Sequence, residues 1–293
     1  MTTVDISVIV PCYNEELHIG GLLQAIYSQT IPIERMEVVI ADGMSTDQTR
    51  TVISNFSLEH TDLEIRVVDN PKKIIPSALN LAIKNAIGKF IVRLDAHSIP
   101  TKNYVELCVS HLESEIAQNV GGLWIINPGN DSLIAKAISI AAAHPLGVGG
   151  AQYRDVNTTP GFVDTVPFGS YQKEYLLNLG LYDESLLTNE DYELNTRIRE
   201  NNGKVYLDTQ IQCEYFAREN LKKLAKQYYR YGFWKFRMLK RYPGSIRLRQ
   251  FMPPAFLLSL LLLLLFSIFS PVFLYGILSL AFVYIVSIFL GTV

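Results

Sequence analysis

Acidic and polar side chains follow three predicted strands in the first hundred residues of the chain. These segments are Pro11-Cys-Tyr-Asn-Glu15, Ala41-Asp-Gly-Met-Ser-Thr-Asp47 and Asp95-Ala-His97. A further acidic pair, Glu190-Asp191, opens a predicted helix. Carboxylate and imidazole groups can ligate a divalent cation, accept hydrogen bonds from a polar ligand or take a proton from a hydroxyl group. The four segments therefore contain the candidate functional residues.

The elements that position these segments alternate between strand and helix. Runs rich in β-branched residues predict strands at 6–10, 37–41, 63–69 and 89–94. Helical patterns lie between them at 15–28, 46–56 and 76–86. Such alternation predicts βαβ units and a parallel sheet, and the ligands of these sheets bind at the carboxyl ends of the strands. The sequence therefore predicts an α/β fold with its site at that edge.

The pattern is looser beyond Asp95. We expect a strand around 121–124, an Ala-rich helix, a glycine-rich loop, a helix that opens on the Glu190-Asp191 pair, and a last strand. Their ranges are 132–143 for the first helix, 146–154 for the loop, 188–201 for the second helix and 204–207 for the strand.

Charge divides the chain into regions that its formal net charge of -2 conceals. Residues 218–249 contain eleven Lys and Arg against a single Glu, whereas residues 250–293 contain no charged side chain. We therefore expect a catalytic domain, a basic aromatic segment and a hydrophobic tail. The boundaries are 1–217 for the domain, with halves at 1–98 and 99–217, then 218–250 for the segment and 251–293 for the tail.

The hydrophobic tail is long enough for two membrane helices, because one span needs about 20 apolar residues. Pro271 divides it into 253–270 and 272–290, since a proline tends to end or kink a helix. The first part is short, so one long kinked helix or a re-entrant pair stays open. Cationic segments beside a span remain cytoplasmic. We therefore expect a multi-pass protein of the cell membrane with a cytoplasmic catalytic domain.

The basic segment interleaves Lys and Arg with seven aromatic residues between Tyr228 and Tyr242. Aromatic side chains beside cations suit a helix that lies among lipid headgroups. The same interleaving can bind single-stranded nucleic acid, but the neighbouring hydrophobic tail favours lipid. Membrane lipid is thus an expected partner and nucleic acid is not.

The four acidic segments, in this order, resemble the motifs of family-2 inverting glycosyltransferases with the GT-A fold, over about residues 5–216. The Asp-Gly-Met-Ser-Thr-Asp and Asp-Ala-His variants resemble most the succinoglycan-type β-1,3-glucosyltransferase branch, which extends lipid-linked exopolysaccharide precursors and carries C-terminal membrane helices. The resemblance implies a nucleotide-diphospho-sugar transferase fold, with a mostly parallel sheet flanked by helices. It also implies transfer of glucose or a related hexose from a UDP-sugar to a hydroxyl of a lipid-linked saccharide.

The resemblance implies nucleoside contacts from four residues of the first two segments, namely Pro11, Tyr13, Glu15 and Asp42. Asp42 is the one expected to accept hydrogen bonds from uracil or ribose. Asp42 also precedes a predicted helix, so a role in capping that helix is the alternative.

Asp95 and His97 stand where the family has Asp-x-Asp, which holds the cation that bridges two phosphates. A histidine suits Mn²⁺ better than Mg²⁺, which prefers oxygen ligands, so either ion is open. Cationic contacts with the diphosphate are expected from Lys73, from Arg93 and from Arg230. Arg230 belongs to Gln227-Tyr-Tyr-Arg-Tyr231, which resembles the Gln-x-x-Arg-Trp signature of processive members.

Asp191 is the expected general base, because an inverting transfer needs one carboxylate to deprotonate the acceptor hydroxyl. The like charge of Glu190 beside it would raise its proton affinity. The alternative is that both acids merely favour the positive end of the helix macrodipole.

Two other functions compete with this interpretation. A polyprenyl-phosphate monosaccharide synthase shares the fold and the anchors, but its second motif usually keeps both carboxylates, so His97 favours a saccharide hydroxyl as acceptor. A non-catalytic nucleotide-sugar-binding scaffold is indicated only by the missing second carboxylate. The presence of Asp42, Asp95 and Asp191 argues against it.

Overall fold

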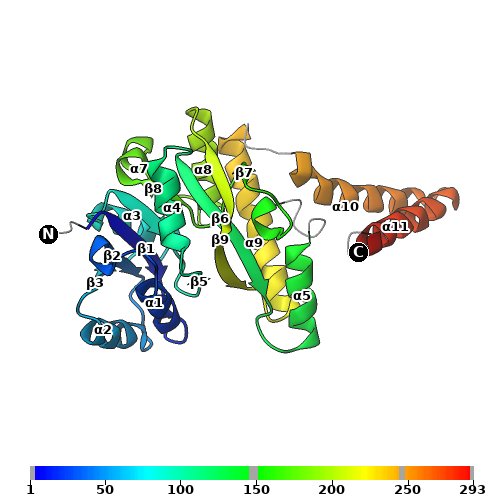
Figure 1. Cartoon of the computed structure of the whole chain (residues 1–293). Helices are drawn as coiled ribbons and strands as arrows, with labels where there is room; N and C mark the ends of the chain where they lie inside the picture. Colours follow the sequence, from blue (N-terminus) through cyan, green and yellow to red (C-terminus); the bar gives the residue numbers. More distant parts are fainter. Residues whose placement is uncertain (1–3, 145–150, 244–247, 291–293) are drawn as a thin grey trace.

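The computed structural model describes residues 4–144, 151–243 and 248–290 of the chain (Figure 1). Its centre is a nine-stranded sheet in the order β3-β2-β1-β4-β8-β6-β9-β5, with β7 paired to β9. The long pairings are parallel, whereas the short strands β5, β7 and β8 pair in the antiparallel sense. The predicted α/β fold with a mostly parallel sheet is therefore confirmed.

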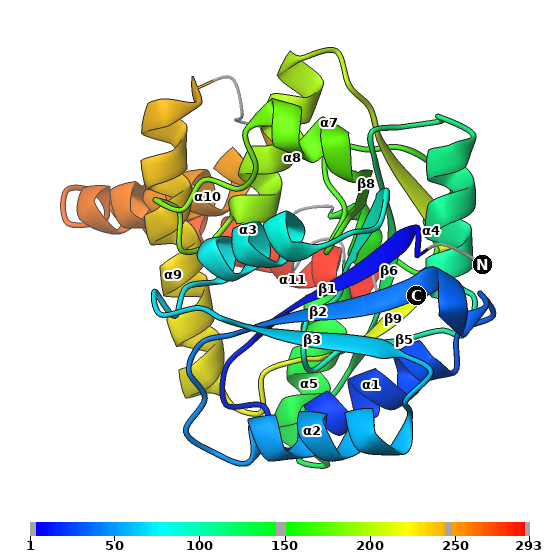
Figure 2. The ribbon, with the colours of Figure 1, turned by 90° about the vertical axis from the view of Figure 1, so that its left-hand side faces the viewer.

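The first half of the sheet consists of the βαβ units that the sequence predicts. Its strands are β1 (Ile6–Cys12), β2 (Met36–Asp42), β3 (Glu64–Asp69) and β4 (Phe90–Arg93), joined through α1 (Ile19–Tyr27), α2 (Thr49–Glu59) and α3 (Ile75–Asn85). Every residue of β1 and β2 is buried, because helices cover both faces. Figure 2 shows α3 on one side of these strands and α1 and α2 on the other.

Alternate residues of each strand enter two separate cores, as the two-residue period of a strand requires. Val8 and Val10 pack in the cluster that includes α1 and α2, whereas Ile9 packs with Leu79 and Ile83 of α3. The strands are therefore fixed in register by two apolar layers, and their carboxyl ends are fixed with them.

The second half of the sheet is mixed. It contains β5 (Ile99–Pro100), β6 (Asn119–Asn127), β7 (Gly161–Phe162), β8 (Ser170–Gln172) and β9 (Val205–Phe216), with helices α4 (Tyr104–Glu113), α5 (Leu133–Ala143), α7 (Lys173–Leu179) and α8 (Glu190–Glu200). β6 pairs with β9 in parallel, and a bulge interrupts this pairing at Gly122. A Cβ atom at Gly122 would lie 1.7 Å from the Ile211 carbonyl oxygen, so the close approach requires glycine.

Several element boundaries differ from the sequence-based expectation. The helix expected at 15–28 begins only at Ile19, because the backbone N–H of Glu15 donates to Thr49 Oγ1 at 2.8 Å and keeps this segment in the loop after β1. The strand expected at 204–207 continues to Phe216. Most of the glycine-rich loop, including Gly147–Gly150, lies outside the described residues, and 152–154 form the 3-10 turn η2 (Gln152–Arg154).

Three helices complete the chain: α9 (Leu221–Arg241), α10 (Leu248–Phe266) and α11 (Val272–Leu290). Asn220 caps α9 by accepting a hydrogen bond from the Lys223 N–H at 2.9 Å. Pro271 lies between α10 and α11, which run side by side apart from the sheet (Figure 1). Considering only the residues described, no helix combines the length and the apolar character needed to cross a membrane.

Candidate active site

The loops after β1 and β2 are tied to each other at the carboxyl edge of the sheet. Gly43 N–H donates to the Cys12 carbonyl at 2.7 Å, and Asn14 exchanges hydrogen bonds of 2.9 Å with Ser45 and Thr46. Pro11 and Cys12 pair with Ala41 and Asp42 in the parallel ladder. The structure therefore brings together the first two predicted segments.

Asp42 is fully buried, and both of its carboxylate oxygens have partners. It accepts hydrogen bonds from Ser45 N–H at 3.0 Å, from Ser45 Oγ at 2.5 Å and from Arg50 Nε at 2.6 Å. Arg50 also contacts Asp69 at 2.5 Å. Asp42 makes no side-chain cap of α2, so it anchors the loop through Arg50 and Ser45. Contact of Asp42 with a nucleoside stays a prediction. A nucleoside donor would share a carboxylate oxygen of Asp42 with Ser45 or Arg50.

Tyr13 and Lys73 lie together beside this loop. Lys73 Nζ is 5.4 Å from the centroid of the Tyr13 ring, which is 46% exposed and packs over Gly43. Lys72 points elsewhere and pairs with Glu184 at 2.6 Å. Of the two adjacent lysines, Lys72 and Lys73, it is therefore Lys73 that lies beside the predicted nucleoside residues.

Arg93 joins the last two predicted segments. Its guanidinium contacts Oδ1 of Asp95 at 3.2 Å, Oε1 of Glu190 at 3.4 Å and Oδ1 of Asp191. The side chain is only 3% exposed, and the rings of Phe168 and Tyr182 lie about 6 Å from it. The partners of Arg93 are three carboxylates. The side chain fixes these acids relative to one another, and its contact with a diphosphate stays a prediction.

The Asp191 carboxyl is only 26% exposed. Burial raises its pKa to about 8; the Arg93 guanidinium opposes this rise, and the charges of Glu190 and Asp95 add to it. The effect expected from Glu190 therefore has the predicted direction but is smaller than that of burial. A carboxylate with this pKa is a stronger base than a solvated aspartate, because it binds a proton more tightly.

His97 and Glu15 come together from the loops after β4 and β1. His97 Nδ1 lies 3.0 Å from Glu15 Oε1, and His18 Nδ1 lies 3.2 Å from the other oxygen. The hydrogen bond to Glu15 raises the pKa of His97, whereas burial acts in the opposite direction. Among the residues that the structure describes, His97 therefore has an acidic partner on one ring nitrogen only.

The predicted metal ligands were tested against this geometry. In the described ranges, no group of three or more His, Cys, Asp or Glu residues is arranged to hold a metal ion. Over those same ranges, Asp95 Oδ2 and His97 Nε2 make no hydrogen bond or ion pair. Two protein ligands suffice when substrate phosphates supply the others, as is usual for Mg²⁺. These two atoms are therefore unoccupied by protein partners, and the metal-ligand role of Asp95 and His97 stays a prediction.

Helix α9 contacts the loop that precedes Glu190. Arg230 Nη2 donates to Thr188 Oγ1 at 3.4 Å, and Asn189 Nδ2 donates to the Tyr231 carbonyl at 3.5 Å. Asn189 has a φ of 68°, a left-handed conformation that asparagine tolerates. The structure thus places the Gln227–Tyr231 segment beside the acidic cluster, which consists of Asp95, Glu190 and Asp191.

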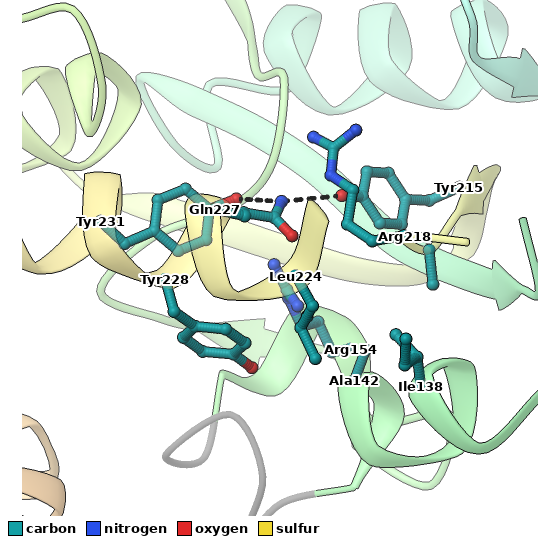
Figure 3. A pocket seen from close by; sticks show the side chains of 10 residues that line it. Ile138, Ala142, Arg154, Tyr215, Arg218, Leu224, Gln227, Tyr228 and Tyr231 are labelled. Atoms are coloured by element: carbon teal, nitrogen blue, oxygen red, sulfur yellow. Dashed lines mark hydrogen bonds between the residues drawn. The ribbon is translucent and has the colours of Figure 1, made fainter. Parts of the chain in front are cut away.

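A pocket lined in part by Gln227 and Tyr231 includes two arginines that the sequence did not single out, Arg154 and Arg218 (Figure 3). Arg50 was also not predicted, although it holds Asp42. The position of Arg154 at the end of the glycine-rich loop expected at 146–154 was a signal that could have found it. In contrast, the pairing of Arg50 with Asp42 depends on the turn between them, which the sequence does not specify.

The chain matches a known protein family over more than half of its length. The profile of "Glycosyl transferase family 2" matches residues 7–179. The chain therefore belongs to glycosyl transferase family 2 and is an enzyme of that class, which confirms the resemblance seen in the motifs.

Two relatives are similar over most of their length. "Dolichyl N-acetyl-alpha-D-glucosaminyl phosphate 3-beta-D-2,3-diacetamido-2,3-dideoxy-beta-D-glucuronosyltransferase" of Methanococcus voltae is 28% identical over 293 residues, which cover 98% of this chain and 86% of that protein. "Succinoglycan biosynthesis protein ExoA" of Rhizobium meliloti (strain 1021) is 29% identical over 257 residues, covering 87% and 76%. The names of these two relatives refer to a dolichyl-linked phosphosugar and to succinoglycan.

A solved structure shares the fold. It is TarS 1-349 of Staphylococcus aureus in complex with UDP, with a TM-score of 0.56 and 19% sequence identity. The match covers 73% of this chain and 60% of that one. At this identity the likeness establishes the GT-A architecture alone.

Proposed function

We propose that the protein transfers a hexose from a UDP-sugar to a hydroxyl of a lipid-linked saccharide, with inversion at the anomeric carbon. The observation that carries the proposal is the contact of one buried guanidinium, that of Arg93, with Asp95, Glu190 and Asp191. Arg93 thereby holds Asp95, in the loop after β4, at a fixed distance from Asp191, the candidate base. Fixed geometry between donor and base is what a direct displacement requires.

Asp191 acts as the general base in this proposal. Its carboxylate accepts the proton of the acceptor hydroxyl as that oxygen attacks the anomeric carbon, and the bond from this carbon to the UDP oxygen breaks. The raised pKa, about 8, makes the carboxylate a capable acceptor. Arg93 holds the base in place and stabilises its charged form.

The donor side is proposed to use the loops after β1, β2 and β4. Pro11, Tyr13, Glu15 and Asp42 surround the nucleoside, and Lys73 and Arg230 approach the diphosphate from the two rims. Asp95 and His97 would hold Mn²⁺ or Mg²⁺, and a bound cation would neutralise charge on the departing UDP. The fold is shared with TarS, whose structure contains bound UDP, and this likeness supports the choice of nucleotide.

The acceptor is proposed from the relatives. The name of the Methanococcus voltae protein specifies a dolichyl-linked phosphosugar, and the Rhizobium meliloti protein is named for succinoglycan biosynthesis. A lipid-linked acceptor also suits the uncharged residues 250–293, which we propose attach the protein to the cytoplasmic face of the cell membrane. The basic aromatic helix α9 would then lie near the lipid headgroups.

The experiment uses the purified full chain with Mn²⁺, a panel of radiolabelled nucleotide sugars and a membrane lipid extract. We expect label from a UDP-sugar to become butanol-extractable, and mild acid to release an oligosaccharide. Release of a single sugar would instead identify a monosaccharide synthase and contradict the proposed acceptor.

The matched variants are Asp191→Asn and Asp131→Asn, since Asp131 is exposed on the loop before α5. We expect Asp191→Asn to reduce turnover by at least about a hundredfold, as loss of a general base does, with the Kd of UDP within about twofold. Asp131→Asn should leave both unchanged. An unchanged turnover in Asp191→Asn would remove this residue as the base.

A further inference from the structure

Helix α5 carries apolar side chains on the face that is turned away from the rest of the protein. The residues of its inward face are Ala135, Ile138, Ser139 and Ala142, which are all buried. On the opposite face, Leu133 is 85% exposed and Ile140 is 63% exposed, with the exposed Ala137 between them. These three residues have the spacing i, i+4, i+7, which places them in one stripe along the helix.

The outward stripe of α5 has little polar character around it. The only charged residue of the helix is Lys136, and Ile134, beside the stripe, is also exposed. Single exposed apolar residues are common on soluble proteins, whereas a contiguous apolar patch marks a surface that contacts another protein or a membrane. The stripe of α5 is therefore a candidate contact surface, and its neighbours indicate what it contacts.

Helix α9 shows the same arrangement with aromatic residues. Its inward face includes Met238, which is fully buried. Tyr229, Phe233 and Phe236 are exposed and again have the spacing i, i+4, i+7. The rings of Tyr229 and Phe233 are stacked, with their centroids 6.5 Å apart. α9 therefore has an outward aromatic stripe.

Cations lie on the same face of α9 as the aromatic stripe. The Arg237 guanidinium is 5.1 Å from the centroid of the Phe233 ring, and Lys240 Nζ is 4.9 Å from that of the Phe236 ring. The other cations of this face are Lys222 and Lys226, both exposed. Neither α5 nor α9 contains an acidic residue. Exposed aromatic residues among cations suit a helix that lies in a layer of anionic lipid headgroups.

α5 and α9 adjoin each other on the side of the molecule that carries the tail. Ile138 and Ala142 of α5 line the same small pocket as Leu224 and Tyr228 of α9 (Figure 3). Figure 1 shows both helices on the side of the sheet that faces α10 and α11. Residues 250–293, which form most of these two helices, contain no charged side chain. Both stripes therefore belong to helices next to the part of the chain that we propose attaches to the membrane.

We propose that α5 and α9 together form a surface that binds anionic membrane lipid. The stripe of Leu133, Ala137 and Ile140 enters the boundary between headgroups and acyl chains, and the cations of α9 contact the headgroups. The inference rests on the proposed membrane attachment, and it adds α5 as a second element that contacts lipid.

Charge favours a lipid layer over a second copy of this chain as the partner of this surface. In a two-fold dimer, each copy would present the same surface to the other. The cations of α9 would then lie close to the same cations of the partner, and like charges across an interface are unfavourable. Anionic headgroups are complementary to the same residues.

The test measures the environment of α5 in the full chain, reconstituted in nanodiscs of phosphatidylcholine and phosphatidylglycerol in equal parts. The variant Leu133→Cys is labelled with the fluorophore NBD. The native cysteines, Cys12, Cys108 and Cys213, are all buried, so the label reacts with the introduced thiol. We expect the emission to shift to shorter wavelength than in water, and to be quenched by lipids that carry a doxyl group on an acyl chain.

The matched control is Leu58→Cys. Leu58 is 74% exposed on α2, which lies far from α10 and α11 in Figure 1. Its label should show the emission of a fluorophore in water and no quenching by doxyl lipid. Ile140→Cys labels the other end of the same stripe, and keeps the test decisive if Leu133→Cys does not fold.

Three results would overturn the inference. Labels at positions 133 and 140 that behave like the label at position 58 would show that α5 does not enter the lipid. Equal quenching in nanodiscs of phosphatidylcholine alone would show that anionic headgroups have no part. A shift to shorter wavelength without doxyl quenching, in a protein whose measured mass is that of a dimer, would identify a second copy as the partner.

The outcome is separable from that of the proposed function. Quenching at position 133, in a protein that transfers no sugar to a saccharide hydroxyl, would refute the proposed transfer and leave this surface standing. Sugar transfer by a protein in which the labels at positions 133 and 140 remain in water would refute this surface alone.

Discussion

Arg93 and Arg154 are two arginines near the same site with opposite surroundings. Arg93 is buried among Asp95, Glu190 and Asp191, whereas Arg154 is stacked on Trp124 and Tyr153 with a buried Nε that has no partner. The first arginine is already satisfied by the protein and positions other groups. The second has a buried donor that no acceptor satisfies, and no carboxylate among the described residues pairs with it. An arginine near a site therefore reveals its role through its partners, and its residue type alone does not.

The largest expected effect comes from removing the satisfied arginine. Arg93→Met would leave several buried or half-buried carboxylates without their cation, so we expect the free energy of unfolding to fall by about 3–5 kcal/mol and transfer to be lost. Arg154→Met should change stability by less than about 1 kcal/mol, because no carboxylate depends on this side chain. Urea denaturation of both variants measures the difference, and equal losses of stability would break the comparison.

A smaller effect is expected in the pH dependence of stability. The pKa of Asp191 is about 8 in the folded protein and about 3.9 in an unfolded chain, so the folded state binds the proton more tightly. The contribution of Asp191 is therefore favourable at low pH and is progressively lost as pH rises from about 4 to about 8.

Asp191→Asn should remove this decline. The measurement is the urea midpoint of the wild-type protein and the variant between pH 5 and 9, at constant ionic strength. Parallel curves for the two proteins would show that the Asp191 carboxyl is not perturbed in the folded state.

The smallest effect is expected from Glu190→Gln. The charge of Glu190 contributes to the raised pKa of Asp191, but less than burial does. The pH midpoint of turnover should therefore shift to a lower value by a modest amount. Turnover measured against pH in this variant and in Glu184→Gln, which alters an acid that pairs with Lys72 instead, would separate a local charge effect from a general one.

The first half of the fold was predictable because its strands are buried on both faces. β1, β2 and β4 are fully buried and mostly apolar, and a polar segment follows each of these strands. In contrast, β5, β7 and β8 are only two or three residues long, which is too short for a periodic pattern to show. Helix α4 was not predicted either.

The sequence predicted which residues form the candidate site, but it did not predict the contacts between them. The acids of all four segments were identified, but Arg93 lies 97 and 98 positions from Glu190 and Asp191 in the sequence, and only the fold brings them together. Similarly, the unsatisfied Nε of Arg154 depends on the packing of η2 against Trp124. Such properties arise from tertiary structure.

The central claim is that Asp191, half-buried beside Arg93, is the base that deprotonates the acceptor. The most direct measurement is the single-turnover rate of sugar transfer from a UDP-sugar between pH 6 and 10, with acceptor and Mn²⁺ saturating. Because only the carboxylate form accepts a proton, the rate should rise with pH and level off, with a midpoint near the pKa of about 8. A rate that is constant across this range, or that falls from pH 6 upward, would contradict the account.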